Sequence, residues 1–175
     1  MKKRAVFLDR DGVINKRAKD HDYIKNWDQF EFLPNVARTI RSLNKNFLVV
    51  VVSNQRGMSR GIMTMSDVLD INRKMQSALK KDKAAIDKIY ICPHSLKDNC
   101  SCRKPKPGLL LAAARDLDID LTKSYIVGDS MSDIEAGKKA GCKTIFLGTP
   151  ENITVKSDFT VKNILEIPKI LNSLN

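Results

Sequence analysis

Residues 5–15 read AVFLDRDGVIN, an apolar run followed directly by two aspartates that are separated by one residue. Three further apolar runs end in polar or metal-binding residues: 48–52 at Ser53-Asn54, 89–91 at Cys92, and 125–127 at Gly128-Asp129. Short runs that are apolar on consecutive residues and rich in Val and Ile are typical of strands buried on both faces of a parallel sheet. Ligands of such sheets bind beyond the carboxyl ends of the strands, so we expect these polar residues to share one rim and form a site.

The rest of the chain alternates predicted strands and helices, which indicates an α/β fold with crossover connections. Helical patterns cover five segments: 34–43, 64–79, 108–117, 133–140 and 164–171. Two more strands are predicted at 143–147 and 159–161. The sequence shows no internal repeat or linker, so we expect a single domain spanning residues 1–175.

Length and composition agree with an ordinary globular domain. The chain has 175 residues, of which 42% are hydrophobic and 29% charged. These values are usual for one domain with a real core. Apolar stretches are too short to cross a bilayer. The residues before Asp9 are too few for the apolar part of a secretory signal, so a cytoplasmic location is expected.

The net charge of +11 indicates an anionic partner. Nucleic acid and a small anionic substrate are the two alternatives. Aromatic residues make up only 6% of the chain, and none alternate with the basic clusters as a base-stacking platform requires. The pattern therefore favours solvated helix faces and a small anionic ligand over a nucleic-acid groove.

Asp9 and Asp11 place two carboxylates on the exit of the first strand. Carboxylates this close repel each other unless a cation lies between them or one of them is protonated. Asp129 and Asp133 would make the same rim more acidic. A divalent cation held by oxygens, most simply Mg²⁺, resolves the repulsion, and a carboxylate beside it can attack phosphorus. The alternative is a polar turn without chemistry.

Four potential zinc ligands lie between residues 92 and 102. Cys92 and His94 are separated by one residue, as are Cys100 and Cys102, so each pair can bind one ion from extended backbone. Three thiolates and an imidazole satisfy tetrahedral Zn²⁺. The alternatives are reduced buried thiols or a disulfide, which a reducing compartment disfavours. We predict a structural zinc that holds the loop leading to Lys104, and a core position for Cys142.

Taken together, the motifs resemble those of the haloacid dehalogenase (HAD) superfamily of phosphohydrolases. They are DRDGV at 9–13, SNQ at 53–55, Lys104, and GDSMSD at 128–133. The resemblance spans nearly the whole chain and implies a Rossmann-like parallel sheet flanked by helices. It implies that Asp9 is the nucleophile and Asp11 the general acid/base. Mg²⁺ would be held by Asp9, Asp129 and the backbone carbonyl of Asp11. Ser53 and Lys104 would contact the transferring phosphoryl group, and Asp133 would orient Lys104 or a metal-bound water.

The predicted zinc motif restricts the resemblance to a smaller group of enzymes within the superfamily. The pattern C-x-H with C-x-C-R-K-P-x-P-G is similar to the heptose bisphosphate and histidinol-phosphate phosphatases, compact members without a large cap domain. The segment 15–23 also resembles the heptose enzymes, where the Asp-His-x-Tyr part, here Asp20-His21-Asp22-Tyr23, lines the substrate pocket. Two departures lie beside the substrate: the loop between the zinc pairs is shorter, and Ser130 replaces a common lysine.

The resemblance implies a Mg²⁺-dependent phosphomonoesterase that acts on a small sugar phosphate. The best candidate is D-glycero-D-manno-heptose 1,7-bisphosphate, cleaved at the 7-phosphate by a monomeric enzyme. Histidinol phosphate is the alternative substrate, and a polynucleotide-end phosphatase or nucleic-acid-associated zinc protein is the alternative class. Substrate contacts are predicted for six residues: Asn54, Arg103, Asp20, His21, Tyr23 and Ser130. His21 would equally suit an exposed loop position, and Tyr23 could instead be a packing anchor.

Overall fold

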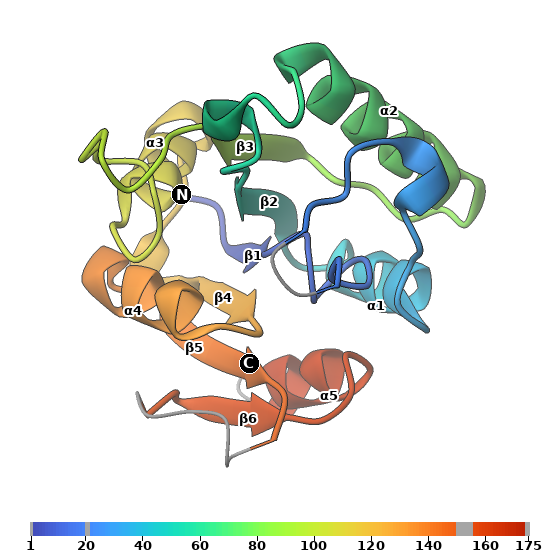
Figure 1. Cartoon of the computed structure of the whole chain (residues 1–175). Helices are drawn as coiled ribbons and strands as arrows, with labels where there is room; N and C mark the ends of the chain where they lie inside the picture. The colour runs from blue at the N-terminus through green and yellow to red at the C-terminus, as the bar shows by residue number, and fades with distance from the viewer. Residues whose placement is uncertain (1, 20–21, 150–155, 174–175) are drawn as a thin grey trace.

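A computed structural model describes residues 2–19, 22–149 and 156–173. Six strands form one parallel sheet in the order β3-β2-β1-β4-β5-β6 (Figure 1). The strands are β1 (Ala5–Leu8), β2 (Leu48–Asn54), β3 (Lys88–Cys92), β4 (Tyr125–Gly128), β5 (Lys143–Leu147) and β6 (Phe159–Val161). The α-helices are α1 (Val36–Leu43), α2 (Met65–Lys81), α3 (Gly108–Leu117), α4 (Met131–Ala140) and α5 (Glu166–Ser173). Short 3₁₀ helices are η1 (Trp27–Gln29), η2 (Met58–Arg60) and η3 (Leu121–Lys123).

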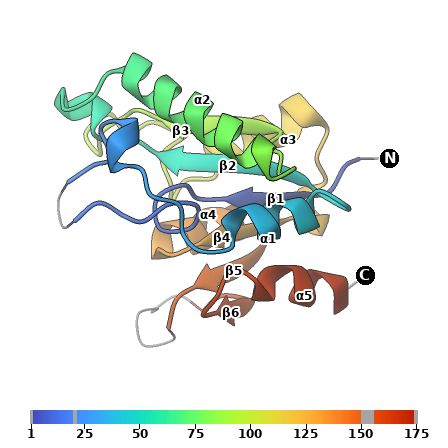
Figure 2. The ribbon, with the colours of Figure 1, turned by 90° about the vertical axis from the view of Figure 1, so that its right-hand side faces the viewer.

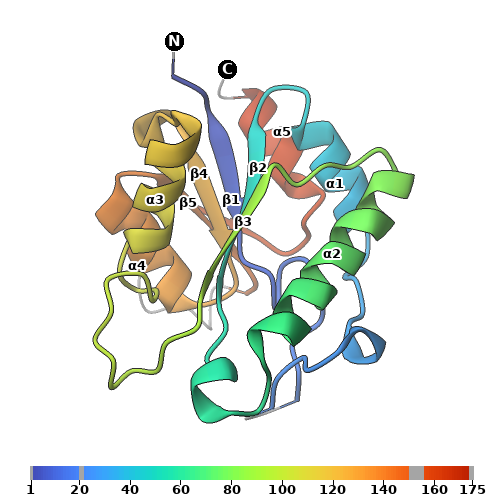
Figure 3. The ribbon, with the colours of Figure 1, turned by 90° about the horizontal axis from the view of Figure 1, so that it is seen from above.

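Helices cover both faces of the sheet, as the view from above shows (Figure 3). α1, α2 and α5 lie on one face, and α3 and α4 lie on the other; Figure 2 shows the first group from the side. Alternate residues of β1 pack into two hydrophobic cores, one on each face of the sheet. Val6 and Leu8 pack in the larger cluster, whereas Ala5 and Phe7 pack in the smaller one. All four are fully buried, which explains why the strand is apolar on consecutive residues.

The strand order reverses between β1 and β4. From β1 the chain extends the sheet to β2 and β3 on one side, and then to β4, β5 and β6 on the other. A parallel sheet of this order forms a crevice at the reversal, outside the carboxyl ends of the two central strands. Asp9 and Asp129 follow those two strands directly. The predicted α/β fold, with a Rossmann-like parallel sheet flanked by helices, is confirmed.

The segment between β1 and α1 folds back on itself close to the carboxyl end of β1 and does not form a separate layer. Lys16 N–H donates to the Glu31 carbonyl at 2.8 Å, and Leu33 N–H donates to the Ile14 carbonyl at 2.9 Å. Within this segment, Trp27 stacks on Phe30 with ring centroids 4.9 Å apart. Among the described residues, this segment contains no helix besides η1 and no strand, which agrees with the expected lack of a large cap domain.

The boundaries of several elements differ from the predicted ones. The helix predicted from residue 133 begins at Met131, because Ser130 and Asp133 form a reciprocal capping box. The helix predicted from 34 begins at Val36, after Asn35 adopts a φ of 67°. The helix predicted from 164 begins at Glu166, and the predicted loop 55–61 contains η2. The capping box predicted at Thr64 and Asp67 is present.

Candidate active site

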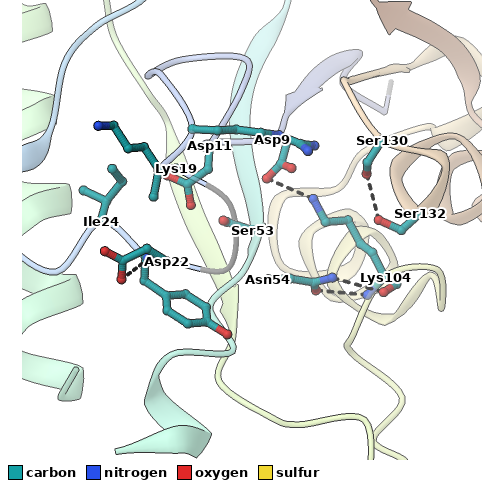
Figure 4. A pocket seen from close by; sticks show the side chains of 13 residues that line it. Asp9, Asp11, Lys19, Asp22, Ile24, Ser53, Asn54, Lys104, Ser130 and Ser132 are labelled. Carbon is teal, nitrogen blue, oxygen red and sulfur yellow. Dashed lines mark hydrogen bonds and ion pairs between the residues drawn. The ribbon is translucent and has the colours of Figure 1, made fainter. Parts of the chain in front are cut away.

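A pocket of about 400 Å³ opens at the reversal of strand order (Figure 4). Asp9, Asp11, Ser53 and Lys104 line it together with Ser130. They come from the ends of β1 and β2, from the loop before α3, and from the N-terminus of α4. Figure 4 shows the Asp9 carboxylate facing the Lys104 ammonium across the pocket floor. The structure thus brings together residues that are about a hundred positions apart in sequence.

Lys104 is buried among acceptors. Its ammonium lies 3.0 Å from Asp9 Oδ1 and 2.5 Å from Asp133 Oδ1, and it donates to the Val52 carbonyl at 2.8 Å. The side chain is only 1% exposed. Burial alone would lower the pKa of Lys104, but the attraction of Asp133 and Asp9 raises it above its ordinary value. Lys104 is therefore a fixed positive charge on the pocket floor.

Asp9 carries a charge that the protein compensates only in part. Burial, against the pull of Lys104 and with the repulsion of Asp133, Asp11 and Asp129, raises its pKa from 3.8 to about 7. The Arg10 N–H donates to Asp9 Oδ1 at 2.7 Å, which fixes the carboxylate orientation. A further cation at this site would keep Asp9 ionised at neutral pH.

Carboxylate oxygens suited to such a cation are present. One oxygen each of Asp9, Asp129 and Asp133 lies within 4.8 Å of the others. Asp133 is fully buried, with Oδ1 on Lys104 and Oδ2 accepting from the Ser130 hydroxyl at 2.5 Å. Its oxygens are thus already engaged, which fits the predicted role of orienting Lys104. Both oxygens of Asp129 contact Arg17, but that side chain is 53% exposed and can move away, whereas the partners of Asp133 are buried or fixed by the capping box. Asp9 and Asp129 are therefore the better candidates for oxygen ligands, and hard oxygen ligands suit Mg²⁺.

Gly12 leaves the space in which Asp129 lies. Its φ is +97°, in the left-handed region that favours glycine, and a Cβ there would lie 1.7 Å from Asp129 Oδ2. The DxDG turn therefore needs glycine for two reasons, its backbone conformation and the close approach of the opposite strand end.

Asp11 is held by several donors. Asn15 donates to its Oδ1 at 2.8 Å, and Gln55 donates to its Oδ2 at 3.0 Å. The buried Arg10 guanidinium lies 3.1 Å from Oδ2 and reaches Asn72 on α2 with its other amino group. These contacts hold the Asp11 side chain, 29% exposed, in the wall of the pocket. A carboxyl fixed beside Asp9 is suited to proton transfer at the reacting group.

Ser53 and Asn54 both lie at the end of β2, but their side chains make different contacts. The Ser53 hydroxyl accepts a hydrogen bond from Gln55 Nε2 at 2.9 Å and lies on the pocket surface. The Asn54 amide donates to the Lys104 carbonyl at 3.0 Å and accepts from the Lys104 N–H at 3.1 Å. Asn54 therefore fixes the backbone of Lys104, and the predicted contact between Asn54 and substrate stays a prediction.

The four predicted zinc ligands meet in space. Cys102 Sγ lies 3.2 Å from Cys92 Sγ, 3.4 Å from Cys100 Sγ and 3.2 Å from His94 Nδ1. Tetrahedral zinc with thiolate bonds of about 2.3 Å places its ligands about 3.8 Å apart, so the cluster is close to this geometry. The three sulfurs and the imidazole nitrogen thus fit one structural zinc ion.

The three thiols of this cluster differ in acidity: burial raises the pKa of Cys92 to about 12 and also raises the pKa of Cys102, whereas the pKa of Cys100 is lowered. Burial would raise the pKa of Cys100, but hydrogen bonds from Cys102, from Cys92 and from backbone N–H groups lower it to about 7. One sulfur of the cluster is therefore prepared to be a thiolate, the form that binds zinc. Cys142 lies apart from the cluster, buried in the smaller core as predicted, and burial raises its pKa to about 12.

Loss of zinc is expected to loosen the loop that carries Lys104. Cys100→Ser should abolish stoichiometric zinc in the purified protein, lower the thermal midpoint by about 4 °C or more, and reduce phosphatase activity. The matched control is Cys142→Ala, which removes the thiol outside the cluster and should keep its zinc. Zinc retained in Cys100→Ser, measured by elemental analysis, would contradict the four-ligand assignment.

The other predicted substrate residues fall into three groups. Tyr23 and Ser130 line the pocket. Arg103 lines a neighbouring hollow of about 290 Å³ instead, where it donates to the His94 carbonyl at 3.2 Å. Asp20 and His21 lie outside the described residues. Roles in substrate binding stay predictions for all of them.

Four residues of the site had no predicted role. Arg10, Asn15 and Gln55 orient Asp11, and Arg17 forms an ion pair with Asp129. Arg10 and Asn15 belong to the DRDGVIN stretch, and Gln55 belongs to SNQ, so their motifs pointed to them. Arg17 lies inside the 15–23 stretch that resembles the heptose enzymes, but nothing in its neighbours in sequence indicates that it turns back to Asp129 after β4.

Comparison with known proteins agrees with this geometry. A HAD-hydrolase-like family model matches residues 101–165. The D-glycero-beta-D-manno-heptose-1,7-bisphosphate 7-phosphatase of Pasteurella multocida is 36% identical over 184 positions, covering 98% of each chain. The D-glycero-alpha-D-manno-heptose-1,7-bisphosphate 7-phosphatase of Mycobacterium tuberculosis is 42% identical over 150 positions, covering 82% of this chain and 78% of that protein.

A solved structure is also similar over nearly the whole chain. It is the D,D-heptose 1,7-bisphosphate phosphatase from B. bronchiseptica, crystallised with magnesium and phosphate. The TM-score is 0.86 at 30% identity, covering 98% of this chain and 99% of that one. Fold, site and similarity together define a HAD-like phosphatase, a phosphoric monoester hydrolase. Within this class, the chain belongs to the family of D-glycero-D-manno-heptose-1,7-bisphosphate 7-phosphatases.

Proposed function

We propose that this protein removes the 7-phosphate of D-glycero-D-manno-heptose 1,7-bisphosphate through an aspartyl-phosphate on Asp9. The observation that carries the proposal is the buried Asp9 carboxylate, 3.0 Å from the Lys104 ammonium, in a pocket at the reversal of strand order. Family relatives named for this substrate cover 98% of the chain. Asp9, Asp129 and the Asp11 backbone carbonyl would hold Mg²⁺, which supplies positive charge against the phosphate oxygens when bound.

The reaction follows from the positions of the side chains. An Asp9 carboxylate oxygen forms a bond to phosphorus as the bond from phosphorus to the C7 oxygen of the sugar breaks, and Asp11 donates a proton to the leaving oxygen. A water then attacks the aspartyl-phosphate, gives its proton to Asp11, and releases phosphate with the free Asp9 carboxylate. Lys104 neutralises charge on the phosphoryl oxygens, and the Ser53 hydroxyl hydrogen-bonds one of them.

We further propose that the protein is a cytoplasmic monomer and that residues 1–175 form one catalytic domain. A thiol cluster arranged for metal, with the fourth cysteine free, suits a reducing compartment. Among the helices that the structure describes, none combines the length and apolar character that crossing a bilayer requires. Tyr23 is the one aromatic side chain among the described residues that line the pocket, which favours a sugar phosphate over a nucleic-acid end whose bases stack on several rings.

Kinetics on matched substrates test the proposal. We expect kcat/KM with Mg²⁺ to be at least about tenfold higher for the heptose bisphosphate than for histidinol phosphate or a 5′-phosphorylated oligonucleotide. Both anomers of the bisphosphate should be measured, because the two relatives compared above act on different anomers by name. A tenfold preference for histidinol phosphate or for the oligonucleotide end would overturn the proposed substrate.

A further inference from the structure

Arg17 pairs with a carboxylate that the proposed magnesium site also needs. Its guanidinium forms a two-pronged contact with Asp129: Nη2 donates to Oδ1 at 2.6 Å, and Nε lies 2.5 Å from Oδ2. Asp129 is 14% exposed and is one of the three carboxylates whose oxygens lie within 4.8 Å of one another. Arg17 thus places a positive charge directly on Asp129.

The pair is built so that it can open. The Arg17 side chain is 53% exposed, so its guanidinium can leave Asp129 for solvent or for a ligand without crossing the core. The backbone just before it is fixed, since Lys16 N–H donates to the Glu31 carbonyl and Asn15 Nδ2 donates to the Lys16 carbonyl. Side-chain rotation is therefore enough to move the charge, with no rearrangement of the loop.

A freed Arg17 would remain in the pocket. Arg17, Lys19, Tyr23 and Ile24 line the same hollow as Asp9 and Lys104. Figure 4 shows Lys19, Asp22 and Ile24 on the side of the pocket opposite Lys104. A phosphate at Asp9 and Lys104 would leave this wall as the part of the pocket that the rest of a sugar bisphosphate can contact. Among the described residues of this wall, Asp22 is paired with Lys25 at 2.8 Å, and Arg17 and Lys19 contribute positive charge.

We infer that Arg17 exchanges partners: it pairs with Asp129 in the metal-free protein, and it binds the second phosphate of the bisphosphate once a divalent cation has taken Asp129. This inference rests on the proposed function. A guanidinium fork matches a phosphate as well as a carboxylate. The exchange makes metal and bisphosphate binding mutually favourable, because the cation releases the group that the second phosphate needs.

Two measurements on Arg17→Gln test the exchange. Calorimetric titration with Mg²⁺ alone should show about threefold or greater tightening relative to wild type, since the competing ion pair is gone. The ratio of kcat/KM for the heptose 1,7-bisphosphate to that for the heptose 7-phosphate should fall about tenfold or more, since only the bisphosphate carries the second phosphate. Lys16→Gln is the matched control, because it removes the neighbouring positive charge, which pairs with Glu31 outside the pocket.

The two measurements test the competition at Asp129 and the contact with the second phosphate separately. Unchanged Mg²⁺ affinity in Arg17→Gln would overturn the competition at Asp129, and an unchanged ratio would overturn the contact with the second phosphate. Equal changes in Lys16→Gln would overturn both, by showing a general effect of net charge. A wild-type protein with no preference for the bisphosphate would contradict the proposed substrate, whatever the Mg²⁺ titration of Arg17→Gln shows.

Discussion

Asp9→Asn is expected to lower the turnover of the phosphatase by about 10⁴-fold or more, because the amide cannot form the acyl-phosphate. The fold should survive the change. Burial and neighbouring carboxylates already raise the pKa of Asp9 to about 7, so the buried charge is costly to keep. Asparagine retains the oxygen that accepts from the Arg10 N–H and from Lys104. Steady-state hydrolysis and thermal unfolding of the metal-free protein measure the two effects.

A surface aspartate provides the control for this substitution. Asp70 pairs with Arg73 and Lys74 on the exposed face of α2, at 2.6 and 2.8 Å, so Asp70→Asn should keep wild-type turnover. Activity of Asp9→Asn above about one hundredth of wild type would exclude Asp9 as the nucleophile, provided that mass spectrometry shows no deamidation back to aspartate.

The sheet and the rim of the site were predictable because both depend on short local patterns. Each apolar run is buried on both faces, and the residue after it reaches the carboxyl edge by geometry alone. Asp9, Ser53 and Asp129 needed no other information. The zinc ligands were also predictable from the sequence, since the C-x-H and C-x-C spacings allow few other ligand sets.

Contacts made at long range were less predictable. The sequence leaves open whether Asp133 orients Lys104 or a metal-bound water, and the structure pairs Asp133 with Lys104 while the α4 capping box holds its other oxygen. Asn54 lines the pocket, so its predicted contact with substrate stays a prediction, but the sequence did not indicate that its amide also binds the Lys104 backbone. Arg17 was missed because its partner is 112 residues away, and an exposed basic loop carries no periodicity that would indicate where a side chain turns.

Lys104→Met should remove both activity and a large part of the stability. In its absence Asp133 is a buried carboxylate without its cation, and the Val52 carbonyl loses its donor. Breaking a buried pair by removing one partner costs about 3–5 kcal/mol of unfolding free energy. The raised pKa of Lys104 means that its contribution is fully present below the ordinary lysine pKa of about 10.4, and is lost only as the pH rises through the higher folded value. Urea unfolding at pH 8 therefore measures it in full.

The ion pair between Lys139 and Glu135 gives the matched comparison for Lys104→Met. It joins neighbouring turns of α4 at 3.3 Å, with side chains 51% and 36% exposed, so Lys139→Met should cost only about 0.3–0.5 kcal/mol. Adding Asp133→Asn to Lys104→Met should restore part of the lost stability, because it removes the unpaired charge, but it should not restore turnover. If Lys104→Met unfolds at the same urea concentration as Lys139→Met, the buried lysine does not hold the two carboxylates together, and its place on the pocket floor serves the phosphate alone.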